Sequence, residues 1–182
     1  MWRVHRHIGM GGDQLVTAVA GEDAEREHGD SLRDAAREEF GRLRAECAPL
    51  EGAHDLVVEL KHRGLVVVLA SSSRQDDLDY FLDELEVRDV VDGWTTADDV
   101  ERTKPHPDVI HVALAKAGTD DAVMVGDSRW DIEAASNAGL ATVCVITGGW
   151  SEQELRDHGA AAVFESLVEL REHLEETPLG GR

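Results

Sequence analysis

Three short polar stretches of this sequence carry the residue types that bind phosphate groups and divalent cations. The first is Ser71-Ser72-Ser73, the second contains Lys104, and the third presents Asp127. The Ser71 hydroxyl and the backbone amides after it suit phosphate oxygens, and the ammonium of Lys104 would add a positive charge. The carboxylate of Asp127 suits a hard cation such as Mg²⁺, which takes few protein ligands and keeps several waters.

Two of these stretches directly follow segments that are predicted to be buried strands. Residues 65–70 (LVVVLA) are a continuous aliphatic run, and residues 123–125 (VMV) lead to the turn before Asp127. Such runs are typical of parallel strands that are covered on both faces. Because parallel strands present their carboxyl ends at one edge of a sheet, we expect Ser71, Lys104 and Asp127 to meet there.

The chain divides into two regions with different patterns of predicted secondary structure, followed by a short tail. Residues 1–49 are polar and predict helices only, over 13–20 and 30–47, whereas residues 50–175 alternate helix and strand. This alternation predicts a parallel sheet with helices on both faces. The predicted strands are 65–70, 90–95, 123–125, 141–146 and 161–164. Residues 176–182 are expected to be a frayed tail.

The overall charge limits the classes of partner that this chain can bind. Lysines and arginines number 18 and aspartates and glutamates 38, which gives a net charge of −20. Such a surface repels phosphate backbones and anionic headgroups, so neither nucleic acid nor membrane is expected as a partner. The two cysteines, Cys47 and Cys144, form neither a disulfide framework nor a zinc motif, which fits a reduced, cytoplasmic setting.

Taken together and in this order, the three polar stretches resemble three of the four motifs of the haloacid dehalogenase-like hydrolases. They read Ala70-Ser71-Ser72-Ser73, Lys104-Pro105-His106-Pro107-Asp108 and a run from Val125 to Ala135, VGDSRWDIEAA. The nearest subgroup is that of the phosphoglycolate phosphatase and β-phosphoglucomutase-like enzymes. The resemblance covers nearly the whole chain. It implies an α/β fold, with a Rossmann-like parallel sheet in a core over 50–175 and a partial helical cap over 1–49.

The resemblance also implies a role for each motif residue. Ser71, with the backbone amide of Ser72, would bind the phosphoryl group, and Lys104 would steady the charge of the nucleophile and the phosphoryl group. Asp127 would hold Mg²⁺, and Asp131 would orient the waters of the metal or Lys104.

Substrate selection in relatives with a cap comes from the cap loop. By position this loop falls within residues 6–12, which makes Arg6 and His7 possible substrate contacts.

One expected motif is absent from the sequence. The nucleophile of the family is an aspartate in an Asp-x-Asp pair after the first, central strand, and no strand followed by such a pair precedes Ser71. The first strand is therefore expected to be missing. Two explanations compete: an N-terminal truncation of the sequence, or a genuine loss of the nucleophile from the protein. We favour truncation, because a sheet without its central strand leaves unpaired backbone groups and an apolar gap.

The function implied for the full-length form is Mg²⁺-dependent hydrolysis of a small phosphorylated metabolite through an aspartyl-phosphate. Because residues 1–182 supply no nucleophile, we expect this chain itself to be inactive or nearly so. The alternative is a non-catalytic protein that binds a phosphate ligand or regulates a partner. The identity of the substrate, the choice between phosphatase and mutase, and the oligomeric state stay open.

Three other motifs in the sequence are not favoured as functional sites. Gly9-Met10-Gly11-Gly12 lacks the third glycine and the buried strand of a dinucleotide-binding fingerprint. The run from Gly126 to Trp130 resembles a nucleophile elbow of a serine esterase but has tryptophan where the sharp turn needs glycine. His5 and His7 alternate like a metal-binding pair, yet no carboxylate or cysteine follows at ligand spacing.

Overall fold

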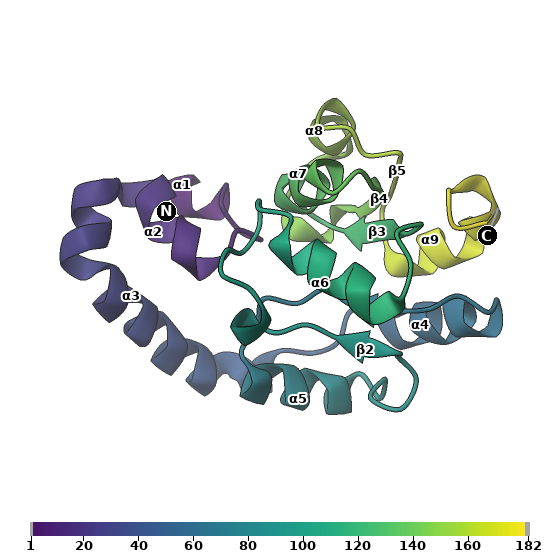
Figure 1. The fold of residues 1–182 in the computed structure, drawn as a ribbon, viewed down its shortest axis with the longest axis horizontal. Helices are drawn as coiled ribbons and strands as arrows, with labels where there is room; N and C mark the ends of the chain where they lie inside the picture. Colours follow the sequence, from purple (N-terminus) through teal and green to yellow (C-terminus); the bar gives the residue numbers. More distant parts are fainter. Residues whose placement is uncertain (1, 181–182) are drawn as a thin grey trace.

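A computed structural model describes residues 2–180 of the chain (Figure 1). It contains parallel β-strands and α-helices in alternation, preceded by helices alone, as the sequence predicts. The strands are β1 (Val68–Leu69), β2 (Gly93–Trp94), β3 (Val123–Gly126), β4 (Ala141–Val145) and β5 (Ala162–Phe164). The α-helices are α1 (Trp2–His5), α2 (Gly12–Ala20), α3 (Glu22–Leu43), α4 (Ala53–His62), α5 (Gln75–Glu84), α6 (Asp108–Ala117), α7 (Arg129–Asn137), α8 (Glu152–Asp157) and α9 (Leu167–Glu172).

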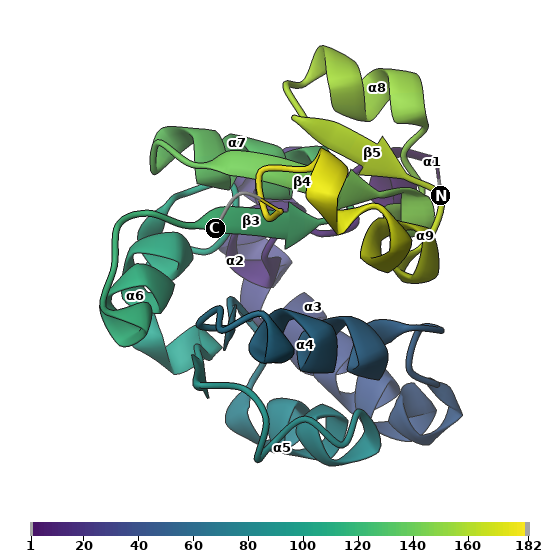
Figure 2. The same cartoon turned by 90° about the vertical axis from the view of Figure 1, so that its right-hand side faces the viewer.

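Strands β3, β4 and β5 form a parallel sheet that helices cover on both faces. Successive residues of a strand point to opposite faces, and β4 shows this clearly. Val143 and Val145 pack in one cluster with Leu56 of α4 and with α9, while Cys144 packs in another with α7 and α8. Figure 2 shows α8 and α9 on either side of β5. The aliphatic, non-alternating strands are thus buried on both sides, which is the pattern that parallel sheets require.

Strands β1 and β2 form a second parallel sheet, separate from the first. Among the described residues, β1 pairs with β2 alone and β3 pairs with β4 alone. The strand order therefore breaks between β1 and β3, as the sequence predicts. Figure 2 shows the helices of the first half, α4 and α5, on the opposite side of this break from β3, β4 and β5.

The amino-terminal helices extend away from the sheets along one side of the molecule (Figure 1). Helix α3 begins at Glu22, eight residues before the predicted start, and only Gly29 within it is buried. Apolar side chains along it are exposed: Leu32 is 47% and Leu43 51% accessible. The far end of α3 touches α5, where Phe40 lies beside Phe81. No strand occurs in residues 2–49, as the sequence predicts.

Two parts of the structure differ from the sequence-based expectations. The aliphatic run 65–70 forms a strand only over Val68–Leu69, because one of its edges has no strand beside it. The expected frayed tail is packed instead over residues 176–180, where Thr177 and Leu179 are each 7% exposed. Leu179 belongs to the apolar cluster under α4 and α9, and this burial holds the tail in place. No helix among residues 2–180 is long and apolar enough to cross a membrane.

Candidate active site

The turn after β3 places two carboxylates side by side. Helix α7 begins with a capping box, in which the backbone N–H and the hydroxyl of Ser128 donate to Oδ2 of Asp131, at 3.1 and 2.7 Å. The N–H of Asp127 donates to the same oxygen at 3.2 Å. Gly126 is required here, because a Cβ atom at this position would lie 2.5 Å from the Cβ of Asp131. The local sequence thus fixes Asp131 beneath the end of β3 and leaves Asp127 beside it.

Lys104 reaches this pair of carboxylates from the loop before α6. Its Nζ donates to Oδ1 of Asp131 at 2.7 Å. The Lys104 side chain is 17% exposed and that of Asp131 5%, so the ion pair is largely withdrawn from solvent. Asp131 accepts from Lys104 through one oxygen and from the turn through the other. It therefore orients the lysine from a rigid helix start.

The carboxylate of Asp127 accepts fewer hydrogen bonds than that of Asp131. Its Oδ2 accepts one hydrogen bond, at 3.0 Å, from the hydroxyl of Thr147, which follows β4. Burial, and then the neighbouring charge of Asp131, raise the pKa of Asp127 above its ordinary value of 3.8. Gly148 also lies against Asp127, since a Cβ there would come within 2.7 Å of its carboxyl group. The Asp127 carboxylate is consequently crowded, and its ionised form accepts few hydrogen bonds to offset its burial.

Ser71 and Ser72 lie beyond the end of β1. The Ser71 hydroxyl accepts a hydrogen bond from the N–H of Ser73 at 3.0 Å, and the Ser71 carbonyl accepts one from the hydroxyl of Thr95 at 2.7 Å. The Ser72 hydroxyl oxygen is buried and has no hydrogen-bond partner. A buried polar atom without a partner is costly, and a ligand oxygen would satisfy it.

The segment Gly9–Gly12 comes close to the site from the amino-terminal region. The N–H of Gly11 donates to the carbonyl of Lys104 at 3.2 Å, and Asp13 accepts hydrogen bonds from Thr103. Burial alone would raise the pKa of Asp13, but the bonds from Thr103 and Gln14 bring it below 3.8. Gly9 has a φ of 91°, and a Cβ there would lie 2.7 Å from the Ser128 hydroxyl. These glycines allow the backbone to approach the site.

Arg6 and His7, the two expected cap-loop residues, both contact side chains of the α/β core. Arg6 donates to Glu154 at 2.6 Å, and its guanidinium carbon lies 3.8 Å from the centre of the Trp150 ring. His7 stacks on Trp130 with a centroid separation of 5.6 Å. In this arrangement the two side chains anchor the amino-terminal segment, and their role toward substrate stays a prediction.

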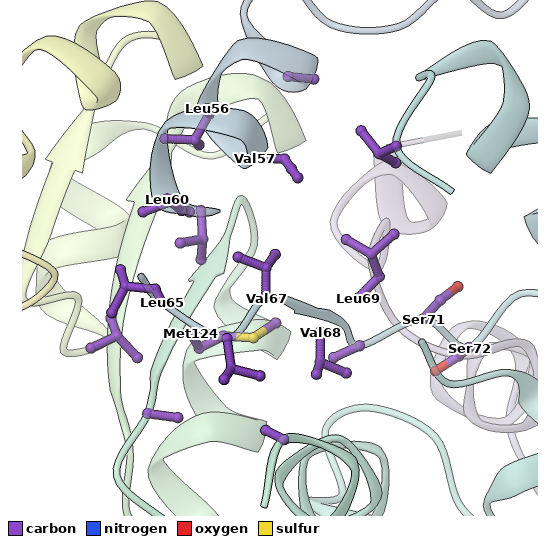
Figure 3. A pocket seen from close by; sticks show the side chains of 18 of the residues that line it. Leu56, Val57, Leu60, Leu65, Val67, Val68, Leu69, Ser71, Ser72 and Met124 are labelled. Atoms are coloured by element: carbon purple, nitrogen blue, oxygen red, sulfur yellow. The ribbon is translucent and has the colours of Figure 1, made fainter. Parts of the chain in front are cut away.

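A cavity of about 1100 Å³ lies between the two sheets. Figure 3 shows the side chains of residues that line it. Lys104, Ser71 and Ser72 line one end of it, together with the segment Gly9–Gly12, while the rest of the lining is mostly aliphatic. Asp127 lies beside Asp131 and is not part of this lining. The structure therefore groups the predicted residues as two serines and a lysine at the cavity, with the carboxylate pair behind the lysine.

Sequence reasoning did not find Thr147 or the Asp13–Thr103 contact. Thr147 carried a signal, since it follows the predicted strand 141–146 and so belongs to the same sheet edge as Asp127. Asp13 and Thr103 are 90 residues apart, and no local pattern links them.

The donor set fits a divalent cation in part. Asp127 offers carboxylate oxygen, the ligand type that Mg²⁺ prefers, and a cation would offset the repulsion that raises its pKa. Among residues 2–180 there is no group of three histidine, cysteine or acidic side chains placed to hold a metal ion. Asp127 alone would thus offer one ligand of an incomplete set.

Comparison with known proteins agrees with the fold. A family model described as "Haloacid dehalogenase-like hydrolase" matches residues 2–145. Pyrophosphatase PpaX of Bacillus cereus (strain AH820) is 34% identical over 97 residues, which cover 52% of this chain and 45% of the relative. The match thus spans less than half of that relative's length.

Two solved structures extend the likeness to 80% of the chain or more. A hydrolase from Pseudomonas syringae superposes with a TM-score of 0.88 and 31% identity, covering 96% of this chain and 82% of the other. A HAD family hydrolase from Deinococcus radiodurans R1, solved with bound phosphate and sodium, gives a TM-score of 0.68 and 25% identity, covering 80% and 67%. The fold, the motif order and the extent of the family match together show that this chain belongs to the haloacid dehalogenase-like hydrolases.

Proposed function

We propose that this chain belongs to a phosphatase-type hydrolase that acts on a small phosphomonoester with the aid of Mg²⁺. The observation that carries the proposal is the convergence of Ser71, Ser72 and Lys104 at one end of a cavity, with Asp127 beside the partner of that lysine. Hydroxyl, amide and ammonium donors match the oxygens of a phosphoryl group.

Each residue has a defined task in this proposal. The hydroxyl of Ser71 and the backbone N–H of Ser72 donate to phosphoryl oxygens, and Lys104 neutralises charge that grows there during transfer. Asp131 keeps the ammonium in place through its 2.7 Å contact. Asp127 would hold Mg²⁺, which when bound supplies further positive charge to the phosphoryl oxygens. Thr147 restrains the Asp127 carboxylate through its hydrogen bond.

The attacking group in this proposal is an aspartate that is not among residues 1–182, and it would form an aspartyl-phosphate. Asp131 is committed to the turn and to Lys104, and Asp13 is committed to Thr103. The Asp127 carboxylate accepts from Thr147 and would hold the cation. In this proposal the described residues bind the phosphoryl group and stabilise its charge. We propose that alone they turn over substrate slowly or not at all.

The substrate class follows from the charge and from the relatives. A net charge of −20 disfavours large polyanions, whereas a local cluster of donors still accepts one small anion. The Deinococcus relative was solved with phosphate bound. A small phosphorylated metabolite is the substrate class that we propose.

The test compares residues 1–182 with a form that carries an added amino-terminal strand ending in Asp-x-Asp. Hydrolysis of p-nitrophenyl phosphate is measured with and without Mg²⁺. We expect background rates for residues 1–182 and Mg²⁺-dependent turnover for the extended form. Replacing the first added aspartate by asparagine is the matched control and should abolish turnover. Lys104→Met in the extended form should lower kcat/KM by about 10²–10³-fold, as loss of a donor to a developing charge does.

Two results would contradict parts of this proposal. Turnover by residues 1–182 that needs Mg²⁺ and disappears in Asp127→Asn would show that the chain already contains its nucleophile. Phosphate binding by the extended form without turnover of any phosphomonoester tested would favour a non-catalytic phosphate-binding protein.

A further inference from the structure

Lys104 is held at both ends of its side chain. Its ammonium lies 2.7 Å from Oδ1 of Asp131, and its backbone carbonyl accepts a hydrogen bond from the N–H of Gly11 at 3.2 Å. A lysine carries its charge on a flexible four-carbon stem, so a contact with the ammonium alone leaves many positions open to it. A second hold on the backbone restricts the positions that the ammonium can reach.

The residue before Lys104 is bound by Asp13 through both carboxylate oxygens. Oδ2 of Asp13 accepts from the backbone N–H of Thr103 at 3.1 Å, and Oδ1 accepts from the Thr103 hydroxyl. Hydrogen bonds to an ionised acceptor are stronger than those between neutral groups. An aliphatic side chain at position 103 would supply only the backbone donor, so this contact selects a residue with a hydroxyl.

The start of α2 is built to allow this contact. Gly11 is the N-cap of the helix, and a Cβ atom on it would overlap the Thr103 hydroxyl. Asp13 lies in the first turn, where an acidic side chain also interacts favourably with the helix dipole. That effect does not require both oxygens of Asp13 to bind a residue of another segment. The dipole alone therefore does not explain how Asp13 is placed.

The segment that holds Lys104 also lies at the polar end of the cavity. Residues 9–12 line this end together with Lys104, Ser71 and Ser72. Asp13 follows this segment and does not belong to the lining that the described residues form. Any effect of Asp13 on a bound phosphoryl group must therefore pass through Lys104.

We propose that Asp13 is a positioning residue for Lys104. Together with the N–H of Gly11, it fixes the backbone of Thr103 and Lys104, while Asp131 fixes the ammonium at the serine end of the cavity. A charge that is already in place stabilises a growing negative charge without rearrangement. A shift of about 1 Å in such a group can cost about 10²-fold in rate. The inference rests on the proposed function in one respect, because the charge that Lys104 meets is that of the phosphoryl group.

The first test needs no catalytic activity and uses residues 1–182. The sequence has three lysines, Lys61, Lys104 and Lys116, so labelling with acetic anhydride followed by peptide mapping gives the rate of each amine. We expect Asp13→Ala to speed the labelling of Lys104 by about three- to tenfold, the change that loss of an exposed hydrogen-bonded contact gives, and to leave the other two rates unchanged. Asp23→Ala is the matched control, because Asp23 is also an exposed aspartate in the first turn of a helix, and it should alter none of the rates.

Variants of Thr103 separate this contact from a general loosening of α2. Thr103→Ser keeps both donors and should leave the labelling rate of Lys104 unchanged. Thr103→Val keeps the shape, loses the hydroxyl and should speed labelling. When Asp13→Ala is already present, Thr103→Val should add little, because the hydroxyl has no partner left to lose. Since Asp13 is exposed and Thr103 half-buried, these variants should all fold, which circular dichroism checks.

The second test uses the strand-extended form and p-nitrophenyl phosphate. Asp13→Ala should lower kcat by about tenfold and change KM by less than about twofold, because a displaced ammonium loses contact mainly with the charge that grows during transfer. Thr103→Ser should keep kcat within about twofold of its original value. A merely structural role of Asp13 would lower stability without this separation of kcat from KM.

Several outcomes would overturn the inference. These are unchanged labelling of Lys104 in Asp13→Ala, equal acceleration of all three lysines, full additivity of the changes at 13 and 103, or an active extended form whose kcat does not depend on Asp13. The inference and the proposed function fail separately. If the labelling of Lys104 responds as expected and the extended form hydrolyses nothing, only the function fails. If the extended form is active and Asp13→Ala alters neither labelling nor kcat, only the positioning role fails.

Discussion

The ammonium of Lys104 lies 2.7 Å from Oδ1 of Asp131, and this pair links the loop before α6 to the start of α7. Asp131 is 4% exposed and also accepts three hydrogen bonds from the turn through its other oxygen. One carboxylate thus fixes the position of the lysine and the geometry of the turn that carries Asp127.

Removing the charge of Asp131 should lower the stability of the folded protein. In Asp131→Asn the capping oxygen remains, but Lys104 keeps a positive charge in a largely buried position without its partner. We expect the free energy of unfolding to fall by about 2–3 kcal/mol, somewhat below the range for fully buried pairs because Lys104 retains some contact with water. Urea denaturation measures this. Glu133→Gln, on the exposed face of the same helix, is the control and should change stability by less than about 0.5 kcal/mol.

Replacing the neighbouring carboxylate, Asp127, should stabilise the folded protein instead of destabilising it. Burial and the charge of Asp131 raise the pKa of Asp127 above 3.8, so its ionised form destabilises the fold. Asp127→Asn removes this penalty and should raise the free energy of unfolding by about 0.5–1 kcal/mol at pH 7, as relief of a strained functional group does.

The pH dependence of this gain has a defined sign. A carboxyl whose pKa is higher in the folded state favours folding while it is protonated and loses that contribution as the pH rises through the folded value. The advantage of asparagine should therefore grow from pH 4 toward pH 7. Thermal unfolding at both values checks this, and an advantage that shrinks with rising pH would contradict the assignment.

The two cysteines should differ sharply in reactivity. Cys144 is fully buried in β4, and burial, with smaller effects of Asp131 and Asp127, raises its pKa to about 12. Cys47 is exposed. Because the thiolate is the reactive form, Ellman's reagent should modify one thiol in the native protein and two in guanidinium chloride. Cys47→Ser should abolish the native reaction, and a persistent native signal in that variant would show that β4 opens.

Arg6 should act as a tether for the amino-terminal segment. It stacks on Trp150 and pairs with Glu154, and both contacts join residues before α2 to the core. Arg6→Ala should lower the free energy of unfolding by about 1 kcal/mol and speed hydrogen exchange over residues 4–12. Arg6→Lys keeps the charge without the planar stacking and should give a partial effect.

The tether should also persist in mild acid. Hydrogen bonds from the Ser151 backbone, and then from Arg6, lower the pKa of Glu154 to about 2. An acid with a lowered pKa keeps its stabilising contribution above its unfolded value of 4.5 and loses it as the pH falls toward the folded one. Exchange over residues 4–12, corrected for intrinsic rates, should therefore change little between pH 7 and pH 5. If Arg6 instead served only substrate, Arg6→Ala would raise KM in the extended form and leave this exchange unaltered.

Local sequence patterns are sufficient to predict much of the site. The aliphatic run before Asp127 and the polar turn after it predict a strand, a turn and a helix, and the structure has β3, the capping box and α7 there. The glycine of this turn is explained only by the structure, since its Cβ would strike Asp131. Gly64 follows the C-cap of α4 with a φ of 82°, which lies in the left-handed region that favours glycine.

The remaining features depend on contacts between distant residues. The lengths of β1 and β2 depend on whether a neighbouring strand is present, which the residues of 65–70 cannot encode by themselves. The packing of Leu179 and the contact of Arg6 with Trp150 join segments more than 100 residues apart. Propensity and periodicity describe a segment, and these contacts are properties of the assembled chain.

The break between β1 and β3 also bears on how the molecule unfolds. Among residues 2–180, the β1–β2 half and the β3–β5 half are joined by side-chain packing, chiefly through α4 and α6, and by no shared ladder of backbone bonds. Cooperative unfolding requires that the loss of one region destabilise the next. We therefore expect the smaller half to open while β3, β4 and β5 stay paired. The protein should then unfold as two coupled units, and the weaker unit should set its susceptibility to proteolysis.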